Sequence, residues 1–382
     1  MEVFLVILAA SIVSSTARAF SSSPRSPPLQ HCPSAVFWFG DSFADTGNAQ
    51  AASPFISAAE YLPYGMTHFG KPSNRYSDGR LVTDFFAQAF RHKSSPGPIL
   101  QSLNSNYEHG IVFAVSGATA LNTSYVVPFY LPVQVDQYLR FVKDAYPTPG
   151  KSHHHHDRKT KLPRNLRSVL HVVVVGTNDI FGAYIRKLMD PGNVTVVIIP
   201  QVIQAISHAI QTLSDSGASQ ILVLNSFPHG CMPLILSVFG DLPKDSRGCL
   251  SPLNEVAEAF NRSLYKLVQD LSSKLKNTLL LYADAFKFTL DVMDRPTDFG
   301  FRNETKTSAC CGTGGAYNFN STKLCGKDFQ PESTTLKPSE FVSWDGIHFS
   351  EAFYEHLSKA LLTGKYLDPP LDFSELCKLG NV

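Results

Sequence analysis

Residues 35–48 read AVFWFGDSFADTGN, an apolar run that passes directly into a Gly-Asp-Ser turn. Residues 35–39 are all apolar, as expected of a strand in a parallel sheet that is covered on both faces. In such sheets, functional sites form at the carboxyl ends of the strands. Ser42 lies on the first turn after this predicted strand, where a hydroxyl can stand clear of the sheet edge. The stretch therefore predicts an α/β fold with Ser42 as a candidate nucleophile.

Buried strands and amphipathic helices alternate along the rest of the chain. Short, mostly apolar runs predict five strands, at 35–39, 111–115, 169–175, 220–225 and 278–283. Between and after them, apolar residues recur at every third or fourth position, as in helices with one buried face, over 203–213, 256–275 and 353–361. This alternation predicts a three-layer α/β/α sandwich with a mostly parallel sheet. Four segments are predicted to be inserts between these elements: 48–69, 94–108, 125–164 and 297–337.

The overall charge argues against two classes of partner. The chain has 33 Lys and Arg against 32 Asp and Glu, a formal net charge of +1. A chain so close to neutral has no net field to attract nucleic acid or an acidic membrane surface. We therefore expect no nucleic-acid partner, and the sequence leaves the oligomeric state open.

The N-terminus is typical of a secretory signal. An apolar run over residues 3–13 precedes Ala17-Arg18-Ala19, a small-residue cleavage pattern, although Glu2 is atypical of such a leader. We predict a signal peptide at 1–19, a Ser/Pro-rich lead-in at 20–33 and one folded domain at 34–382. No apolar segment after residue 20 approaches the ~20 residues of a membrane helix, so no integral membrane segment is expected after cleavage.

Cysteines and glycosylation sequons agree with secretion. Because no Cys-x-x-Cys pair of metal-binding spacing occurs, we expect disulfides and no metal or cofactor. The likeliest pairs are Cys231 with Cys249, and Cys310 or Cys311 with Cys325. Because the total of seven cysteines is odd, at least one thiol stays free or pairs elsewhere. The histidine run 153–156 is interpreted as a solvated loop rather than a metal site. Glycosylation is predicted at five Asn-x-Ser/Thr sequons, Asn122, Asn193, Asn261, Asn303 and Asn320.

Two further segments supply the groups that ester hydrolysis needs beside a nucleophile. Asp345 stands three residues before His348, so its carboxylate can accept from Nδ1 and leave Nε2 facing the serine. The backbone N–H groups of Ser42 and Gly117 and the Asn178 amide could bind the oxyanion. Ordinary readings exist for each: Ser42 as a helix N-cap, Gly117 as a plain turn, Asn178 as a turn residue or cap, and His348 as a structural histidine.

Taken together, four blocks resemble the plant GDSL esterase/lipases of the SGNH hydrolase superfamily, from about residue 34 to 367. The blocks are 39–48, 113–119, 176–179 and 345–348, and segments 64–65, 77–80 and 310–312 also look like the plant branch. The resemblance implies the SGNH hydrolase fold with its flavodoxin-like sheet. It also implies catalytic Ser42, Asp345 and His348, with Ser42, Gly117 and Asn178 as the oxyanion hole.

Departures from the family pattern are mild, because none removes a catalytic atom. Phe43 replaces the leucine that names the motif, Ser116 stands where many members have glycine, and Val112 replaces a common asparagine.

The resemblance predicts a secreted serine esterase of the cell wall or apoplast that hydrolyses carboxylic esters through an acyl-enzyme. The candidate substrates, small or polymeric, are acetylated wall polysaccharide, acyl lipid and phenolic esters. Two alternatives stay open: an acyltransferase that uses the same triad, and an inactive secreted binding or defence protein. The sequence does not fix the acyl group or the alcohol.

Overall fold

All five predicted strands form and lie in one sheet. The computed structural model describes residues 31–53, 57–101, 106–123, 127–146, 161–331 and 335–379. The predicted signal peptide, most of the lead-in and the histidine run 153–156 lie outside these ranges. The five strands are β1 (Ala35–Gly40), β3 (Gly110–Val112), β4 (Val169–Val174), β5 (Gln220–Leu224) and β6 (Leu279–Ala283).

Strand order among the described residues is β2-β3-β1-β4-β5-β6-β7, where β2 (Gly97–Pro98) and β7 (Leu367–Asp368) are short edge strands. All neighbours pair in parallel except β6 and β7. The central strands are buried on both faces, which explains their continuous apolar sequences. Strand β3 is shorter than predicted, but residues 113–115 still donate backbone hydrogen bonds to Trp38 and Gly40 of β1.

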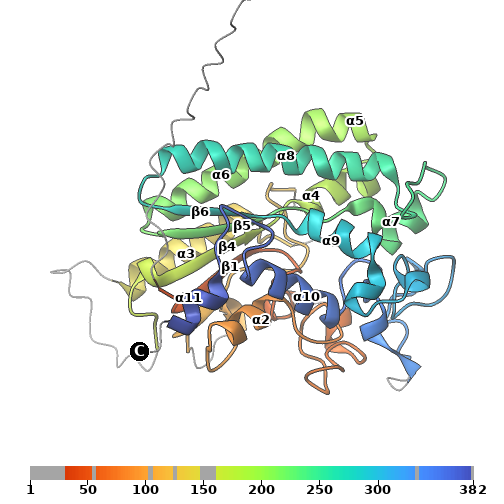
Figure 1. Cartoon of the computed structure of the whole chain (residues 1–382), viewed down its shortest axis with the longest axis horizontal. Helices are drawn as coiled ribbons and strands as arrows, with labels where there is room; N and C mark the ends of the chain where they lie inside the picture. The colour runs from red at the N-terminus through yellow and green to blue at the C-terminus, as the bar shows by residue number, and fades with distance from the viewer. Residues whose placement is uncertain are drawn as a thin grey trace, which may run out of the picture.

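Helices cover both faces of the sheet (Figure 1). One layer contains α3 (Leu131–Ala145), α6 (Ile199–Asp215) and α8 (Ser251–Lys274), with α6 packed against both α3 and α8. The other contains α2 (Val82–Ala89) and α10 (Glu351–Leu362), with α9 (Ala285–Asp294) against α10 and α11 (Phe373–Leu379) near the C-terminus. The three-layer α/β/α prediction is confirmed. Shorter helices lie in the connections: α1 (Asn48–Ala52), α4 (Thr177–Phe181), α5 (Pro191–Asn193) and α7 (Pro233–Val238).

The prediction of an insert over 125–164 is wrong in its middle, because residues 131–145 form helix α3. Leu131, Val135 and Tyr138 recur at helical spacing and are buried against the sheet, and proline stands in the first turn, where it is tolerated. Gln134 is also buried, on the same face. Because polar Gln134 interrupts the short apolar pattern, the sequence did not predict this helix.

A second correction concerns apolar segments. The helical run 191–215 is long and apolar enough to cross a membrane by length and composition, with a mean hydropathy of 1.5 over its best 18 residues. In the structure, its α6 part lies against α3 and α8 as a core helix, burying one apolar stripe that includes Val202, Ile206 and Ile210. Before Asp215, its exposed face carries uncharged residues such as Gln201, Gln204 and Gln211, and this near absence of charge raises the hydropathy of a packed helix.

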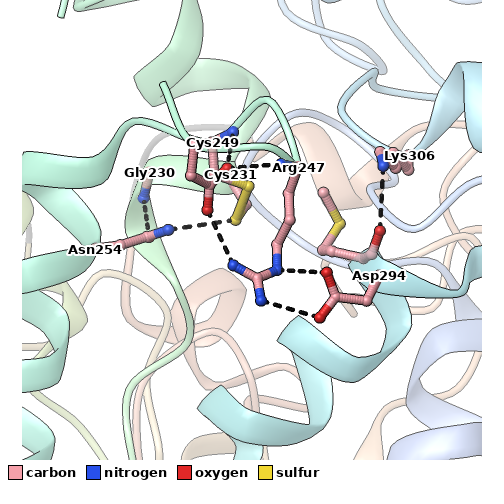
Figure 2. The surroundings of a disulfide bond; sticks show 9 residues. Gly230, Cys231, Arg247, Cys249, Asn254, Asp294 and Lys306 are labelled. Atoms are coloured by element: carbon pink, nitrogen blue, oxygen red, sulfur yellow. Dashed lines mark hydrogen bonds and ion pairs between the residues drawn. A yellow bond between two sulfur atoms is a disulfide. The ribbon is translucent and has the colours of Figure 1, made fainter. Parts of the chain in front are cut away.

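Three disulfides join the cysteines: Cys32–Cys377, Cys231–Cys249 and Cys311–Cys325. Cys310 is the free thiol and is buried. The two predicted short-range pairs are therefore confirmed, and Cys311 rather than Cys310 is the partner of Cys325. Figure 2 shows the surroundings of Cys231–Cys249, where Arg247 forms an ion pair with Asp294 on α9. This pair and the disulfide fasten the 231–249 loop.

Candidate active site

Ser42 lies in a tight turn at the carboxyl end of β1. The strand leaves the sheet at Gly40, which has a φ of +134°. A Cβ atom at this position would lie 1.8 Å from the Val174 carbonyl oxygen, so only glycine fits here. The carbonyl of Asp41 then accepts from the N–H groups of Ala44 and Asp45, both at 3.1 Å. Ser42 caps none of the described helices, since α1 begins only at Asn48. Its N-cap interpretation is therefore wrong.

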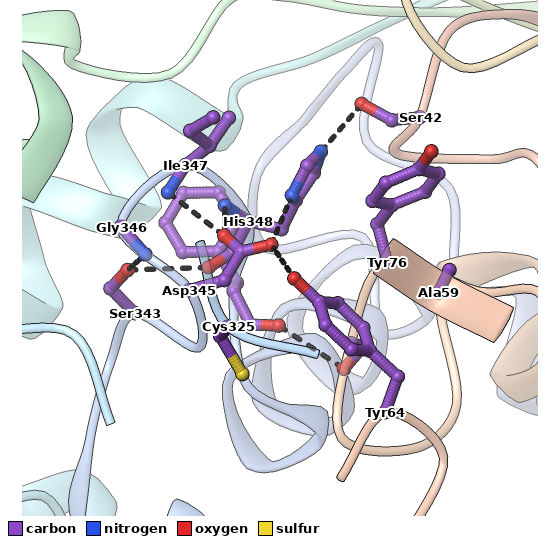
Figure 3. Close-up of polar contacts among 12 residues, drawn as sticks. Ser42, Ala59, Tyr64, Tyr76, Cys325, Ser343, Asp345, Gly346, Ile347 and His348 are labelled. Atoms are coloured by element: carbon purple, nitrogen blue, oxygen red, sulfur yellow. Dashed lines mark hydrogen bonds and ion pairs between the residues drawn. The ribbon is translucent and has the colours of Figure 1, made fainter. Parts of the chain in front are cut away.

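Ser42, His348 and Asp345 form one hydrogen-bonded chain (Figure 3). The Ser42 Oγ lies 2.9 Å from His348 Nε2, and His348 Nδ1 lies 2.7 Å from Asp345 Oδ2. Ser42 and His348 are each only 6% exposed. The serine follows β1 while the other two precede α10, so the fold brings together groups 306 residues apart. The structure thus brings the three predicted residues together in the order serine, imidazole and carboxylate.

The Asp345 carboxylate is surrounded by donors. Its Oδ1 accepts from the N–H groups of Ile347 and His348 at 2.9 and 2.8 Å. Its Oδ2 accepts from Tyr64 Oη at 2.7 Å in addition to the imidazole. Burial acts to raise the pKa of Asp345, but the charge and hydrogen bonds of His348 outweigh it, so this pKa lies below its usual range. Asp345 is therefore held as the carboxylate.

Asn178 and Gly117 lie together at the ends of β4 and β3. The Asn178 Nδ2 donates to the carbonyl of Ala118 at 2.9 Å, which orients the amide and leaves its second N–H for another acceptor. Gly117 has a φ of +79°, a conformation that side chains disfavour. Asp179 accepts from the N–H groups of Ala120 and Leu121 at 2.8 and 3.0 Å. Asp179 thus supports the loop that carries Gly117.

Asp45 and Asn48, in the same block as Ser42, also bind this loop. The Asp45 carboxylate accepts from four backbone N–H groups, of which one is Ser116 at 2.8 Å. The Asn48 amide donates to the carbonyls of Val112 and Ala114 at 2.7 and 2.9 Å. Both side chains are fully buried. The residues that follow Ser42 therefore fix the position of Gly117 relative to the serine.

Two residues near the site could not be assigned a role from the sequence. Tyr76 lies beside His348, with ring centroids 4.8 Å apart, and Figure 3 shows its hydroxyl on the Ser42 side of the imidazole. Gln134 of α3 hydrogen-bonds Gly40, two residues before Ser42. No local sequence signal marks Gln134. Tyr76 stands beside the segment 77–80, so the resemblance pointed close to it.

The sequons separate into two groups. Asn122, Asn193, Asn303 and Asn320 are exposed. Asn261 is buried in α8, and its amide both accepts from the Ser226 N–H and donates to the Ser226 carbonyl, each at 2.9 Å. A glycan on Nδ2 would break this pairing and would lie inside the fold. The structure thus contradicts glycosylation of Asn261, while the other four sites stay predictions.

A cavity of about 710 Å³ lies away from the predicted triad, between α8, α9 and β7. Its walls include Tyr265, Tyr282 and Tyr366, and neither Ser42 nor His348 lines it. Charged and polar groups around it pair with one another, as Tyr265 does with Asp368 at 2.7 Å. We assign the cavity no part in the chemistry at Ser42.

Comparison with known proteins decides the family. The model of the family described as GDSL-like Lipase/Acylhydrolase matches residues 36–361. The chain belongs to this family. A GDSL esterase/lipase of Arabidopsis thaliana is 38% identical over 365 residues, covering 90% of this chain and 91% of that protein. An esterase of Hevea brasiliensis is 32% identical, with 90% and 88% covered, and a GDSL esterase/lipase of Medicago truncatula is 32% identical, with 90% and 89% covered.

Family membership makes this GDSL protein a carboxylic ester hydrolase. Among solved structures, the α/β hydrolase LAE5 from the Lake Arreo metagenome covers 92% of this chain and is covered to 98% itself. Its TM-score of 0.39 and identity of 10% are too low to support an argument. The family match agrees with the resemblance seen in the sequence. It also agrees with the parallel sheet of the structure.

Proposed function

We propose that this GDSL protein is a serine esterase in which Ser42 attacks the ester carbonyl and forms an acyl-enzyme. The observation that carries the proposal is the continuous chain Ser42–His348–Asp345, with contacts of 2.9 and 2.7 Å. His348 takes the Ser42 proton through Nε2 and delivers it to the leaving alcohol. Asp345 keeps the imidazole in the tautomer that has Nε2 free to accept. Water, activated by the same imidazole, then releases the acid.

The backbone N–H groups of Ser42 and Gly117 and the free N–H of Asn178 are proposed to bind the oxyanion. Support comes from the hydrogen bond that joins the Asn178 amide to Ala118, the residue next to Gly117, and from the positive φ of Gly117. Donors fixed in advance stabilise developing charge without reorganising during the reaction. The Asp45 and Asn48 hydrogen bonds supply that fixation.

The proposed substrates are soluble or wall-bound esters with a short acyl group, acted on outside the cell. Ser42 is nearly buried, with Tyr76 beside the imidazole, so a short acyl chain fits the approach better than a long one. Secretion is supported by the leader-like N-terminus, the three disulfides and the four exposed sequons. Acetylated wall polysaccharides are the substrates that combine these properties.

A fluorophosphonate probe and a pair of substrate series test the proposal. The wild-type protein should be labelled on Ser42, and folded Ser42→Ala should be neither labelled nor active. His348→Ala should lose nearly as much activity, because members of a triad act as a unit. If folded Ser42→Ala kept wild-type activity, the nucleophile would lie elsewhere. For the substrate class, kcat/KM should be higher on acetyl esters than on long-chain acyl esters, and the reverse order would overturn it.

A further inference from the structure

The hydroxyl of Tyr64 donates a hydrogen bond to Asp345, and the proposed mechanism gives this contact no role. Tyr64 lies in the 57–69 segment, 281 residues before Asp345, and donates to Oδ2 at 2.7 Å. This is the same oxygen that accepts from His348 Nδ1, also at 2.7 Å. Figure 3 shows the phenol and the imidazole reaching the carboxylate from different sides.

The Tyr64 ring is fixed by packing. It is 2% exposed and lies edge-on to Trp344, the residue before Asp345, with centroids 5.7 Å apart. On the other side, a Cβ at Gly326 would come within 2.8 Å of the ring, so only glycine leaves room for it there. Gly65 donates from its N–H to the Ser77 carbonyl at 3.0 Å and ties the segment to its neighbour. The phenol therefore holds its direction whether or not the hydrogen bond is present.

Burial and the adjacent Asp345 carboxylate raise the pKa of Tyr64 well above its ordinary value. The phenol thus stays protonated at any working pH and acts only as a donor. A donor on Oδ2 draws negative charge away from the oxygen that faces the imidazole. The attraction of Asp345 for a protonated His348 is weakened as a result.

We propose that Tyr64 is a positioning residue that sets the pH range of the enzyme by hydrogen-bonding the carboxylate of Asp345. It limits how strongly Asp345 favours protonated His348, so that His348 is free to accept the Ser42 proton at lower pH. It also fixes the carboxylate plane and, through it, the imidazole. The inference rests on the proposed roles of Ser42, Asp345 and His348.

Other titratable groups face the same pair. Tyr76 lies beside His348, and Tyr354 of α10 interacts with Asp345; burial raises the pKa of both phenols, so both are neutral. The carboxyl groups that act on these two tyrosines are Asp41, Asp45, Asp78 and Asp345 itself. A change at Tyr64 leaves all of them in place. A shift in the pH profile can thus be assigned to the Tyr64 hydroxyl.

Two substitutions at position 64 should move the profile in opposite directions. Tyr64→Phe keeps the ring and removes the donor, and the acid limb of kcat/KM should move to higher pH by about half a unit to one unit. A ring-fluorinated tyrosine at position 64 is a stronger acid and a stronger donor, and it should move the limb to lower pH. A purely structural role would lower activity in both variants without opposite shifts.

The experiment uses the purified full chain, with an acetyl ester as substrate and the fluorophosphonate inactivation rate as a second pH profile. Tyr282→Phe is the matched control, because it removes a buried hydroxyl on β6 that pairs with Asn225 at 2.8 Å, far along the sheet. It should lower Tm and leave the acid limb unchanged. The fluorinated variant keeps the Tyr64 hydroxyl and gives a second readout if Tyr64→Phe does not fold.

Unchanged limbs, or shifts of the same sign in both Tyr64 variants, would overturn the inference. Ser42→Ala separates this failure from failure of the proposed function. If Ser42→Ala is inactive and unlabelled while the Tyr64 variants show no shift, the triad assignment stands and only the Tyr64 inference fails. If Ser42→Ala is active, the proposed function fails as well.

Discussion

Gln134 hydrogen-bonds both backbone groups of Gly40, the N–H and the carbonyl. Its Oε1 accepts from the Gly40 N–H at 2.7 Å, and its Nε2 donates to the Gly40 carbonyl at 2.8 Å. Gln134 is fully buried in α3, 94 residues along the chain from Gly40. Because Gly40 is the last residue of β1, this side chain fixes the direction in which the chain enters the Ser42 turn. The helix layer thus takes part in positioning the serine.

Gln134→Ala should lower both stability and activity. The Gly40 carbonyl keeps the Val115 N–H at 3.0 Å, but the Gly40 N–H loses its side-chain acceptor in a buried place. A buried donor left unpaired costs about 1–3 kcal/mol of unfolding free energy. Urea unfolding and kcat on an acetyl ester measure the two effects. Full activity in a destabilised Gln134→Ala protein would show that the turn holds its position without Gln134.

Asn178→Ala should lower kcat by roughly 10²–10³, the usual effect of losing one oxyanion donor. The fold should be kept, because Asp179 still binds the Ala120 and Leu121 N–H groups. Steady-state kinetics together with thermal unfolding separate the two effects. A loss of less than threefold in kcat would remove Asn178 from the oxyanion hole.

Asp41 should make stability fall as pH rises. Burial raises its pKa from 3.8 to about 8, and Asp179 and Asp45 add to the effect. Between those values the folded chain holds a proton that the unfolded chain has lost. Stability from this group is therefore complete below about pH 4 and is lost as pH approaches 8, with a slope of at most about 1.4 kcal/mol per pH unit.

Asp41→Asn, which cannot ionise, tests this prediction. The Tm of the variant relative to wild type should rise between pH 5 and pH 8. Asp270→Asn, the same substitution at an exposed position of α8, is the matched control. A constant difference for Asp41→Asn would contradict the prediction.

The Cys311–Cys325 disulfide should support the loop that carries Asp345 and His348. Cys310 and Cys311 donate from their N–H groups to the carbonyls of Ser343 and Trp344 at 3.0 and 2.7 Å, directly before Asp345. Replacing both Cys311 and Cys325 by serine opens a loop with a sequence separation of 14, worth roughly 3 kcal/mol on the chain-entropy model. Both Tm and kcat should fall.

The Cys32–Cys377 pair is the control for that variant, because it joins the two ends of the described chain away from Asp345. Its double serine variant should lose stability and keep kcat. Equal kcat in both double variants would show that Cys311–Cys325 stabilises the fold without supporting the loop. Peptide mapping without reduction should also find Cys310 as the one free thiol.

Much of the fold could be predicted because local patterns specify it. The short continuous apolar run of residues 35–39 predicted a buried strand, and the recurrence of apolar residues at every third or fourth position over 203–213, 256–275 and 353–361 predicted helices. Helix α3 was missed because buried Gln134 interrupts its short apolar stripe. The length and apolar composition of 191–215, which would suffice for a membrane helix, were also missed. A packed helix whose exposed face is polar but nearly uncharged has the same composition as a membrane segment.

The sequence by itself determined the chemistry available: a serine after a buried strand, an Asp-x-x-His pair, and a glycine and an asparagine at two further strand ends. Their distances, and the partners that tune them, were decided by the tertiary structure. Gln134 on Gly40, Tyr64 on Asp345 and buried Asn261 are contacts between segments far apart in the chain. Local sequence patterns record the period of an element and the residues at its ends. They do not record which side chain of another element meets a given atom, because that depends on how the layers pack.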